Sequence, residues 1–339
     1  MANTATATAA HGAGAIKTVG AWQVFLATVS FMTLLPFIAV PFTRHVIPDT
    51  ATALNVFLIL NFFGSNFHVA ATGWFYTDPS MRAHFRSKPM RYLIVPALLV
   101  AGSAALFQMA SQSQRGCLLV VFFCWQLWHY QKQNVGLLSF IAAGTDGSPL
   151  SVWERRTLMV AAVAGMLGCF GVGDIGGMHM AWLQQVGVGV YLLVPVGLAV
   201  AVIKNAALRT NRLRLAFLVC GALFFLPAFI FNDPPSAIAS FALAHGLQYL
   251  VFMGVVSTAK RDTVLSVVAL LGIATIGAVL LDMAKDAAAY MNSPYVLALS
   301  GAFYGATMAH FVLDAGIWRL REPFQRRYIR DRFSFVFDR

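Results

Sequence analysis

The sequence carries little charge. Only 11% of its 339 residues are charged, 59% belong to the hydrophobic set, and the mean hydropathy is +0.71. A soluble globular domain carries about 25% charged residues. The composition therefore excludes an ordinary soluble protein and predicts an integral membrane protein.

Cysteine is also scarce. The four cysteines, Cys117, Cys124, Cys169 and Cys220, lie inside apolar runs without paired spacing. A cysteine in such surroundings commonly behaves as a small, buried hydrophobic residue. A disulfide framework or a cysteine zinc site is therefore not expected.

Several catalytic patterns are missing. The chain has only two glutamates, which argues against a carboxylate-rich di-iron site of the ferritin type. It has no glycine-rich phosphate loop between a strand and a helix, and no nucleophile elbow around a serine. Any chemistry must therefore come from other residue types.

Apolar runs of membrane-spanning length are abundant. A bilayer core of ~30 Å needs a helix of ~20 mostly apolar residues. We predict ten spans, at 21–43, 51–76, 91–110, 116–143, 157–173, 180–203, 212–231, 236–259, 263–283 and 294–318. The expected fold is an all-α, polytopic membrane helix bundle. Its single transmembrane domain covers 21–320, between a flexible N-terminal tail over 1–20 and a basic-aromatic cytoplasmic tail over 321–339.

The positive charge indicates an orientation. The net charge is +11. If ten spans alternate, 20 of the 24 Lys and Arg residues fall on one side and only Arg44, Arg115 and Lys285 on the other. Because cytoplasmic loops are rich in Lys and Arg, both termini are predicted to be cytoplasmic, in an inner membrane. The basic tail follows a span directly and interleaves aromatics with arginines, which favours anionic lipid headgroups over nucleic acid as its partner.

Four histidines lie inside predicted spans: His68, His129, His245 and His310. Ionisable residues inside a membrane are costly to bury and commonly mark a functional site. The four spans run in one direction, and the histidines fall at similar depths. They are therefore expected to share one layer of the bundle.

Each of these histidines belongs to a polar stripe with helical spacing, and residues three or four apart share a helix face. The stripes predict one polar chamber, and the side chains expected to line it beside the histidines are Asn61, Gln126, Lys132, Gln133, Gln248, Tyr249, Thr307 and Asp314.

Four imidazoles and a carboxylate are typical ligands of a borderline transition metal. We expect His68, His129, His245 and His310 to hold the metal, with Asp314 as a fifth ligand or as an acceptor for a ring N–H. The glutamines, Asn61 and Tyr249 are expected to orient the imidazoles. Iron is the first expectation, and copper, zinc and haem are alternatives.

The expected function is oxidation, by O₂ at non-haem iron, of a hydrophobic molecule dissolved in the membrane, with or without an electron donor. Two alternatives stay open. A haem would use two facing histidines. A proton-coupled transporter would use the same buried His, Asp and Lys side chains.

A family resemblance points the same way. The clustered histidine boxes of membrane desaturases are absent. Single histidines are instead dispersed over separate helices, in Asn66-Phe67-His68, Trp128-His129-Tyr130, Ala244-His245-Gly246 and the segment His310–Asp314. In this outline the chain resembles the Brp/Blh family of bacterial β-carotene 15,15′-dioxygenases. The resemblance implies a membrane helix bundle that cleaves a carotenoid, and it assigns no ligand residue by residue.

Overall fold

Helices are the sole regular secondary structure in the described part of the chain. The computed structural model describes residues 6–45, 52, 56, 59–60, 62–172, 180–231, 234–259, 262–290 and 293–337. The predicted all-α class is confirmed for these residues.

The elements are as follows: α1 (Thr6–Leu34), α2 (Pro36–His45), η1 (Phe63–Phe67), α4 (His68–Ala71), η2 (Thr72–Tyr76), α5 (Pro79–Ser87), η3 (Met90–Ile94), α6 (Val95–Met109), α7 (Gln112–Thr145), α8 (Val152–Val172), α9 (Ala181–Tyr191), α10 (Leu193–Lys204), α11 (Ala206–Thr210), α12 (Arg212–Leu223), α13 (Pro227–Ile230), α14 (Pro234–Thr258), α15 (Thr263–Tyr290), α16 (Pro294–Ile317), α17 (Pro323–Arg332) and α18 (Ser334–Phe337).

Six helices in the described residues are long and apolar enough to cross a membrane, which supports a membrane protein. They are Met90–Met109, Val152–Val172, Ala181–Lys204, Ser236–Thr258, Thr263–Lys285 and Pro294–Ile317. A seventh crossing is formed if the pair Gly20–Leu34 and Pro36–Thr43, bent by 44°, counts as one span.

The other predicted spans differ from simple apolar helices for identifiable reasons. Helix α7 has 34 residues, but its middle carries several amide side chains and His129. The run 212–231 is divided into α12 and α13, and Pro227 stands at the start of α13. The run 51–76 lies partly outside the described residues, and its described end forms three short helical elements of different pitch.

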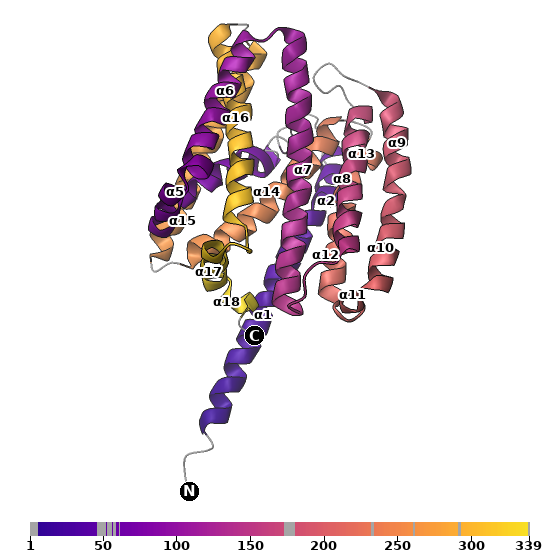
Figure 1. Ribbon diagram of the computed structural model, residues 1–339, viewed down its shortest axis with the longest axis vertical. Coiled ribbons are helices and arrows are strands. Elements are labelled where there is room, and N and C mark those ends of the chain that lie inside the picture. The colour runs from indigo at the N-terminus through magenta and orange to yellow at the C-terminus, as the bar shows by residue number, and fades with distance from the viewer. Residues whose placement is uncertain are drawn as a thin grey trace.

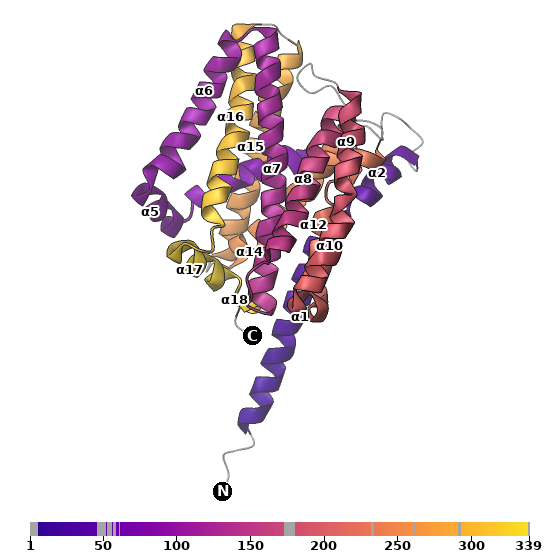
Figure 2. The same ribbon diagram turned by 45° about the vertical axis from the view of Figure 1, so that its right-hand side comes forward.

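Helix α7 stands between two groups of helices. Figures 1 and 2 agree that α6, α15 and α16 lie on one side of it, and α8, α9, α10 and α12 on the other. The beginning of α1 and the C-terminal α18 lie toward the same end of the molecule (Figure 1). Helix α7 is therefore placed to present side chains to both groups.

Glycines allow α6 and α16 to touch along their backbones. A Cβ on Gly305 would lie 2.7 Å from the Cα of Val100, and one on Gly301 would overlap the carbonyl oxygen of Ser103. Small residues four apart are typical of close helix packing in membranes. This contact holds α16, which carries His310, firmly against the bundle.

The two ends of the chain differ from the predicted tails. Residues 6–20 begin helix α1, which projects beyond the bundle (Figure 1). The C-terminal segment folds back as α17 and α18, burying Phe333 and Val336 against the bundle. The Tyr328 hydroxyl donates a hydrogen bond of 2.8 Å to Asp78. Several tail aromatics therefore pack on protein, while α17 keeps exposed arginines on its surface.

A buried arginine ties the loop between α7 and α8 to α12. The fully buried Arg214 forms bidentate ion pairs with Glu154, at 2.8 and 2.9 Å, and with Asp146, at 3.0 Å to both oxygens. Burial opposes the charge of Asp146, yet hydrogen bonds from Ser148, Arg214 and Asn211 hold the pKa of Asp146 below its ordinary value. Its contribution to stability is therefore present at neutral pH and lost as the pH falls below ~4.

We predict that Arg214→Met lowers the free energy of unfolding by about 3–5 kcal/mol, because it leaves the fully buried carboxylate of Glu154 without its partner. Denaturant unfolding of the protein in detergent, followed by circular dichroism, measures the loss. Arg212→Met, an exposed arginine on the same helix, is the matched control and should change little. Equal stability of the two variants would contradict the role given to Arg214.

Candidate metal centre

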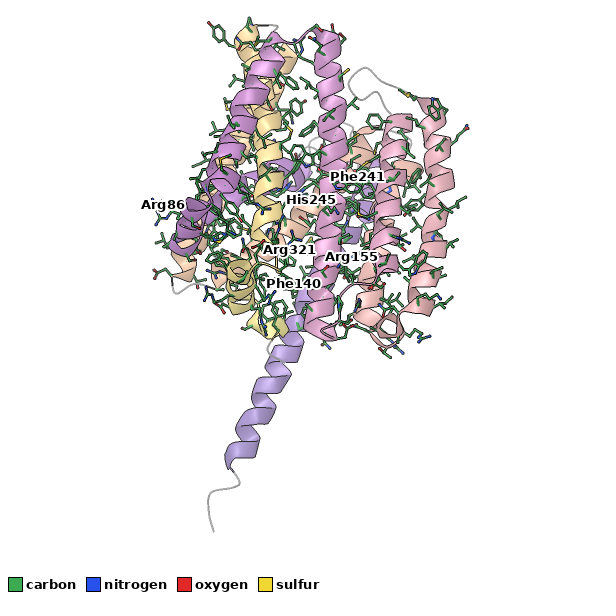
Figure 3. The ribbon with its side chains drawn as sticks, in the orientation of Figure 1. Arg86, Phe140, Arg155, Phe241, His245 and Arg321 are labelled. Atoms are coloured by element: carbon green, nitrogen blue, oxygen red, sulfur yellow. The ribbon has the colours of Figure 1, made fainter. Side chains whose placement is uncertain are left out.

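The four predicted histidines converge in the interior. His68 begins α4, His129 lies in α7, His245 in α14 and His310 in α16, and none exposes more than 8% of its surface. His68 lies 4.8 Å from His245 and 5.0 Å from His310, and His129 lies 4.9 Å from His245 and 5.3 Å from His310, between ring centroids. Figure 3 places His245 near the middle of the bundle's height.

Asp314 completes the cluster. It follows His310 by one helical turn, so both side chains share a face of α16. Its Oδ2 atom lies 3.6 Å from Nε2 of His310 and 3.8 Å from Nε2 of His129. The carboxylate therefore faces the Nε2 atoms of His129 and His310, which come from different helices.

These side chains form two overlapping ligand groups. One is His68, His245 and His310, and the other is His129, His310 and Asp314, with the ligand atoms of each group within 4.8 Å of one another. Two ligands on opposite sides of an ion at ~2.1 Å lie ~4.2 Å apart. Each group is therefore compact enough to be a candidate ligand set, and His310 belongs to both.

Six of the eight imidazole nitrogens in the cluster are buried without a well-formed hydrogen bond. Both ring nitrogens of His68 and of His245, and Nε2 of His129 and His310, are buried and make no well-formed hydrogen bond. His68 has only loose approaches to the Gly64 and Ser65 carbonyls. A buried polar group without a partner costs about 1–3 kcal/mol. A metal ion binds one nitrogen of each imidazole, so an ion at this place would satisfy up to four of these six nitrogens.

A backbone contact between two helices sets the position of His68 relative to His245. Gly246 follows His245 in α14, and a Cβ on it would lie 2.7 Å from the Gly64 carbonyl carbon in η1. Gly64 precedes His68 by four residues, so both lie on one helix face. The wide π-helical turn of η1 also occurs here, and such turns are frequent at functional sites.

Thr72 and Tyr249 orient His310. The Thr72 hydroxyl oxygen lies 2.7 Å from Nδ1 of His310 and 2.8 Å from the Tyr249 hydroxyl, and Tyr249 in turn is directed at the Asp314 carboxylate. When Nδ1–H donates to Thr72, the Nε2 lone pair is free for a metal. This arrangement is typical of metal-binding histidines, whose second nitrogen is held by a hydrogen bond.

The glutamines support the site differently from what the sequence predicted. Gln133 donates to the backbone carbonyl of His245 at 3.0 Å and to Gln248 at 2.9 Å, and Gln248 donates to Thr33 at 2.7 Å. Gln126 donates to the Tyr130 hydroxyl at 2.7 Å. None accepts a ring N–H from the four histidines, so the predicted orienting role is wrong for these amides. Gln133 and Gln248 join α7 to α14 beside the site, whereas the bond of Gln126 stays within α7.

Two further predicted residues do not form part of the cluster, and a third is not among the described residues. Lys132 is exposed, with its Nζ 5.1 Å from the centre of the Trp128 ring, so its placement in the chamber was wrong. The Thr307 hydroxyl is buried but donates to the Phe303 carbonyl of its own helix. Asn61 lies outside the described residues.

Compared with family models, curated proteins and solved structures, the chain shows no match. The chemistry of the centre must therefore be argued from its own geometry.

Two aromatic rings that the sequence analysis did not select line the centre. Tyr130 lies 4.3 Å from His245, and Phe311 lies 4.3 Å from His129 in a stacked arrangement, between ring centroids. Both are immediate sequence neighbours of a cluster histidine. Their apolar character concealed them, because an aromatic residue in a transmembrane helix does not differ in sequence from one that faces lipid.

We predict that Gly246→Ala separates α14 from η1, lowering stability by about 1–3 kcal/mol through overpacking and lowering metal content. Gly254→Ala on the same helix is the matched control, because an added Cβ there meets open space. Thermal unfolding and elemental analysis of both proteins provide the measurement. Loss of metal from both variants alike would count against the backbone contact.

We predict that Thr72→Val weakens metal binding about 10- to 100-fold, as is typical when a partner of a ligating histidine is removed. Thr72→Ser retains the hydroxyl and should restore most of the affinity. Competition with a chelator measures the affinity, and circular dichroism verifies folding. If serine and valine behaved alike, the hydroxyl would have no role at His310.

Proposed function

We propose that this protein is an integral membrane, metal-dependent oxidoreductase that uses non-haem iron to oxidise a hydrophobic molecule dissolved in the bilayer. One observation carries the proposal. Imidazoles from four separate helices meet in the interior with six of their ring nitrogens unpaired and a carboxylate beside them.

The ligand set favours iron among the metals. Imidazole suits iron, copper and zinc, whereas a carboxylate is a harder ligand. Neutral histidines with one aspartate would hold a divalent ion while keeping the net charge of the site small, which lowers its cost inside a membrane. Bound iron would supply the redox chemistry with O₂ that closed-shell organic molecules do not undergo readily by themselves.

The geometry supports a single ion better than a haem. Two axial histidines of a haem leave a flat space between them for the macrocycle. Here His68 and His129 each lie between 4.8 and 5.3 Å from both His245 and His310. Any pair chosen as axial ligands therefore has the other two rings in the space of the macrocycle.

Residues around the four histidines would orient them, supply a negative charge and exclude water. Thr72 holds the tautomer of His310 that presents Nε2, and Tyr249 connects Thr72 with Asp314. Asp314 offers a charge to the ion and an acceptor for a proton. Phe311 and Tyr130 cover the rings of His129 and His245 and exclude water.

The substrate follows from the surroundings. A centre buried in an apolar bundle is reached from the bilayer, which favours a lipid, sterol-like, quinone or polyene molecule. Cleavage of a carbon–carbon double bond, as in the carotenoid dioxygenases that the chain resembles, places both oxygen atoms of O₂ in two carbonyl products and needs no reductant. Insertion of one oxygen atom would instead release water and need two electrons and two protons from a donor.

We further propose ten membrane crossings with both termini in the cytoplasm. The unequal distribution of Lys and Arg supports this orientation. The common end of the bundle at which α1 begins and α18 lies is consistent with an even number of crossings.

We predict about one iron per chain in the full-length protein purified in detergent from iron-supplied cells. His68→Ala, His129→Ala, His245→Ala and His310→Ala should each lower metal content at least about 10-fold. His84→Ala, at a histidine in α5 outside the centre, should retain it. The same samples are given β-carotene in micelles, with O₂ uptake and isotopically labelled O₂ followed in the products.

A metal-free, colourless protein would overturn the proposal and favour proton-coupled transport by the same side chains. Metal that persists after the histidine substitutions would overturn the assignment of the ligands. A haem absorption spectrum would replace non-haem iron by haem.

A further inference from the structure

An apolar groove lies on the outside of the bundle, away from the histidine cluster. It has a volume of about 490 Å³ and is lined by α7, α8, α9 and α10. Small-molecule sites typically measure ~300–1,000 Å³. The groove is separated from the metal centre by α7 itself, because Trp128 lines it with 39% of its surface exposed while the next residue, His129, is buried.

A glycine lets α10 approach α8 closely in the lining of the groove. Gly197 of α10 lies over Thr157 of α8, and a Cβ at Gly197 would lie 2.6 Å from the Thr157 hydroxyl oxygen. The walls include exposed valines, among them Val163 and Val196. The groove therefore offers an apolar surface along neighbouring helices, and this surface suits a hydrocarbon chain.

Two tryptophan–cation pairs stand at the groove. The Nζ of Lys132 lies 5.1 Å from the Trp128 ring centre, and the Arg156 guanidinium carbon lies 5.5 Å from that of Trp153. Both tryptophans and Arg156 line the groove. Tryptophan is enriched at the membrane interface, and Lys and Arg there attract anionic headgroups.

No acidic residue lines the groove to balance these cations. The nearest glutamate in sequence, Glu154, is fully buried and paired with Arg214. Arg155, the neighbour of Arg156, lies toward the end of the molecule where α18 is found (Figure 3). The cations at the groove are therefore not neutralised by an acidic residue of its lining, and the apolar wall residues follow Arg156 along α8 and lie on α10.

We propose that this groove binds an anionic phospholipid, with an acyl chain between α8 and α10 and its phosphate at Lys132 and Arg156. The groove explains the position of Lys132, which the metal centre does not use. This site stands independently of the function proposed for the histidine cluster, since the two share no side chain.

Native mass spectrometry of the full-length protein tests the site. The protein in detergent is incubated with phosphatidylglycerol and phosphatidylcholine that carry identical acyl chains. We expect one phosphatidylglycerol to be retained in preference to phosphatidylcholine. The double variant Lys132→Gln/Arg156→Gln should weaken this preference by about fivefold for each cation. Lys204→Gln/Arg209→Gln removes the same charge from exposed residues outside the groove and should preserve it.

A second pair of variants tests the groove itself. Val196→Trp fills it, whereas Val268→Trp adds the same bulk to α15 at a valine with the same exposure, 58%. We expect Val196→Trp to abolish lipid retention and Val268→Trp to leave it unchanged, with circular dichroism showing that both variants fold. Equal retention of the two lipids, equal loss in both charge variants, or displacement of the bound lipid by β-carotene would overturn the proposal.

Discussion

Unpaired imidazole nitrogens in an apolar interior are the constraint on which the centre of this protein depends. Each such nitrogen is costly to bury without a partner, and the interior offers no bulk water to supply one. The fold gathers six of them, with a carboxylate, within a few ångströms. A bound ion would satisfy one nitrogen of each ring and stabilise the contact between the four helices. Metal binding and folding are therefore expected to be linked.

The surrounding structure can be understood as the means of holding four helices at that point. The backbone contact of Gly246 with Gly64 leaves no room for a side chain and places two histidines together. On the other side of the cluster, the amides of Gln133 and Gln248 bridge α7 and α14. Such interhelical hydrogen bonds are satisfied without water, which is why amides rather than charges serve here.

Charge is confined to places where it can be paired or can reach a headgroup. Arg214 is completely buried, but two carboxylates and several oxygen atoms surround it. Lys132 and Arg156 instead lie over indole rings at the edge of the bundle. The same residue type thus stabilises the fold in one place and offers a contact for lipid in another, according to the partner that the neighbouring helices provide.

The sequence alone determined the helical class and the identity of the clustered side chains, and it predicted the membrane character that six long apolar helices support. These follow from local physics. The free energy of transferring a segment from water into a bilayer indicates which apolar segments can enter it, and the helical repeat places His310 and Asp314 on one face. Only the tertiary structure decided that Thr72 contacts His310, that the glutamines bond elsewhere, and that Lys132 points away. Lys132 lies three residues after His129 and four after Trp128, so its helix face alone permits either direction. The packing of whole helices against one another, between segments far apart in the sequence, decides the direction.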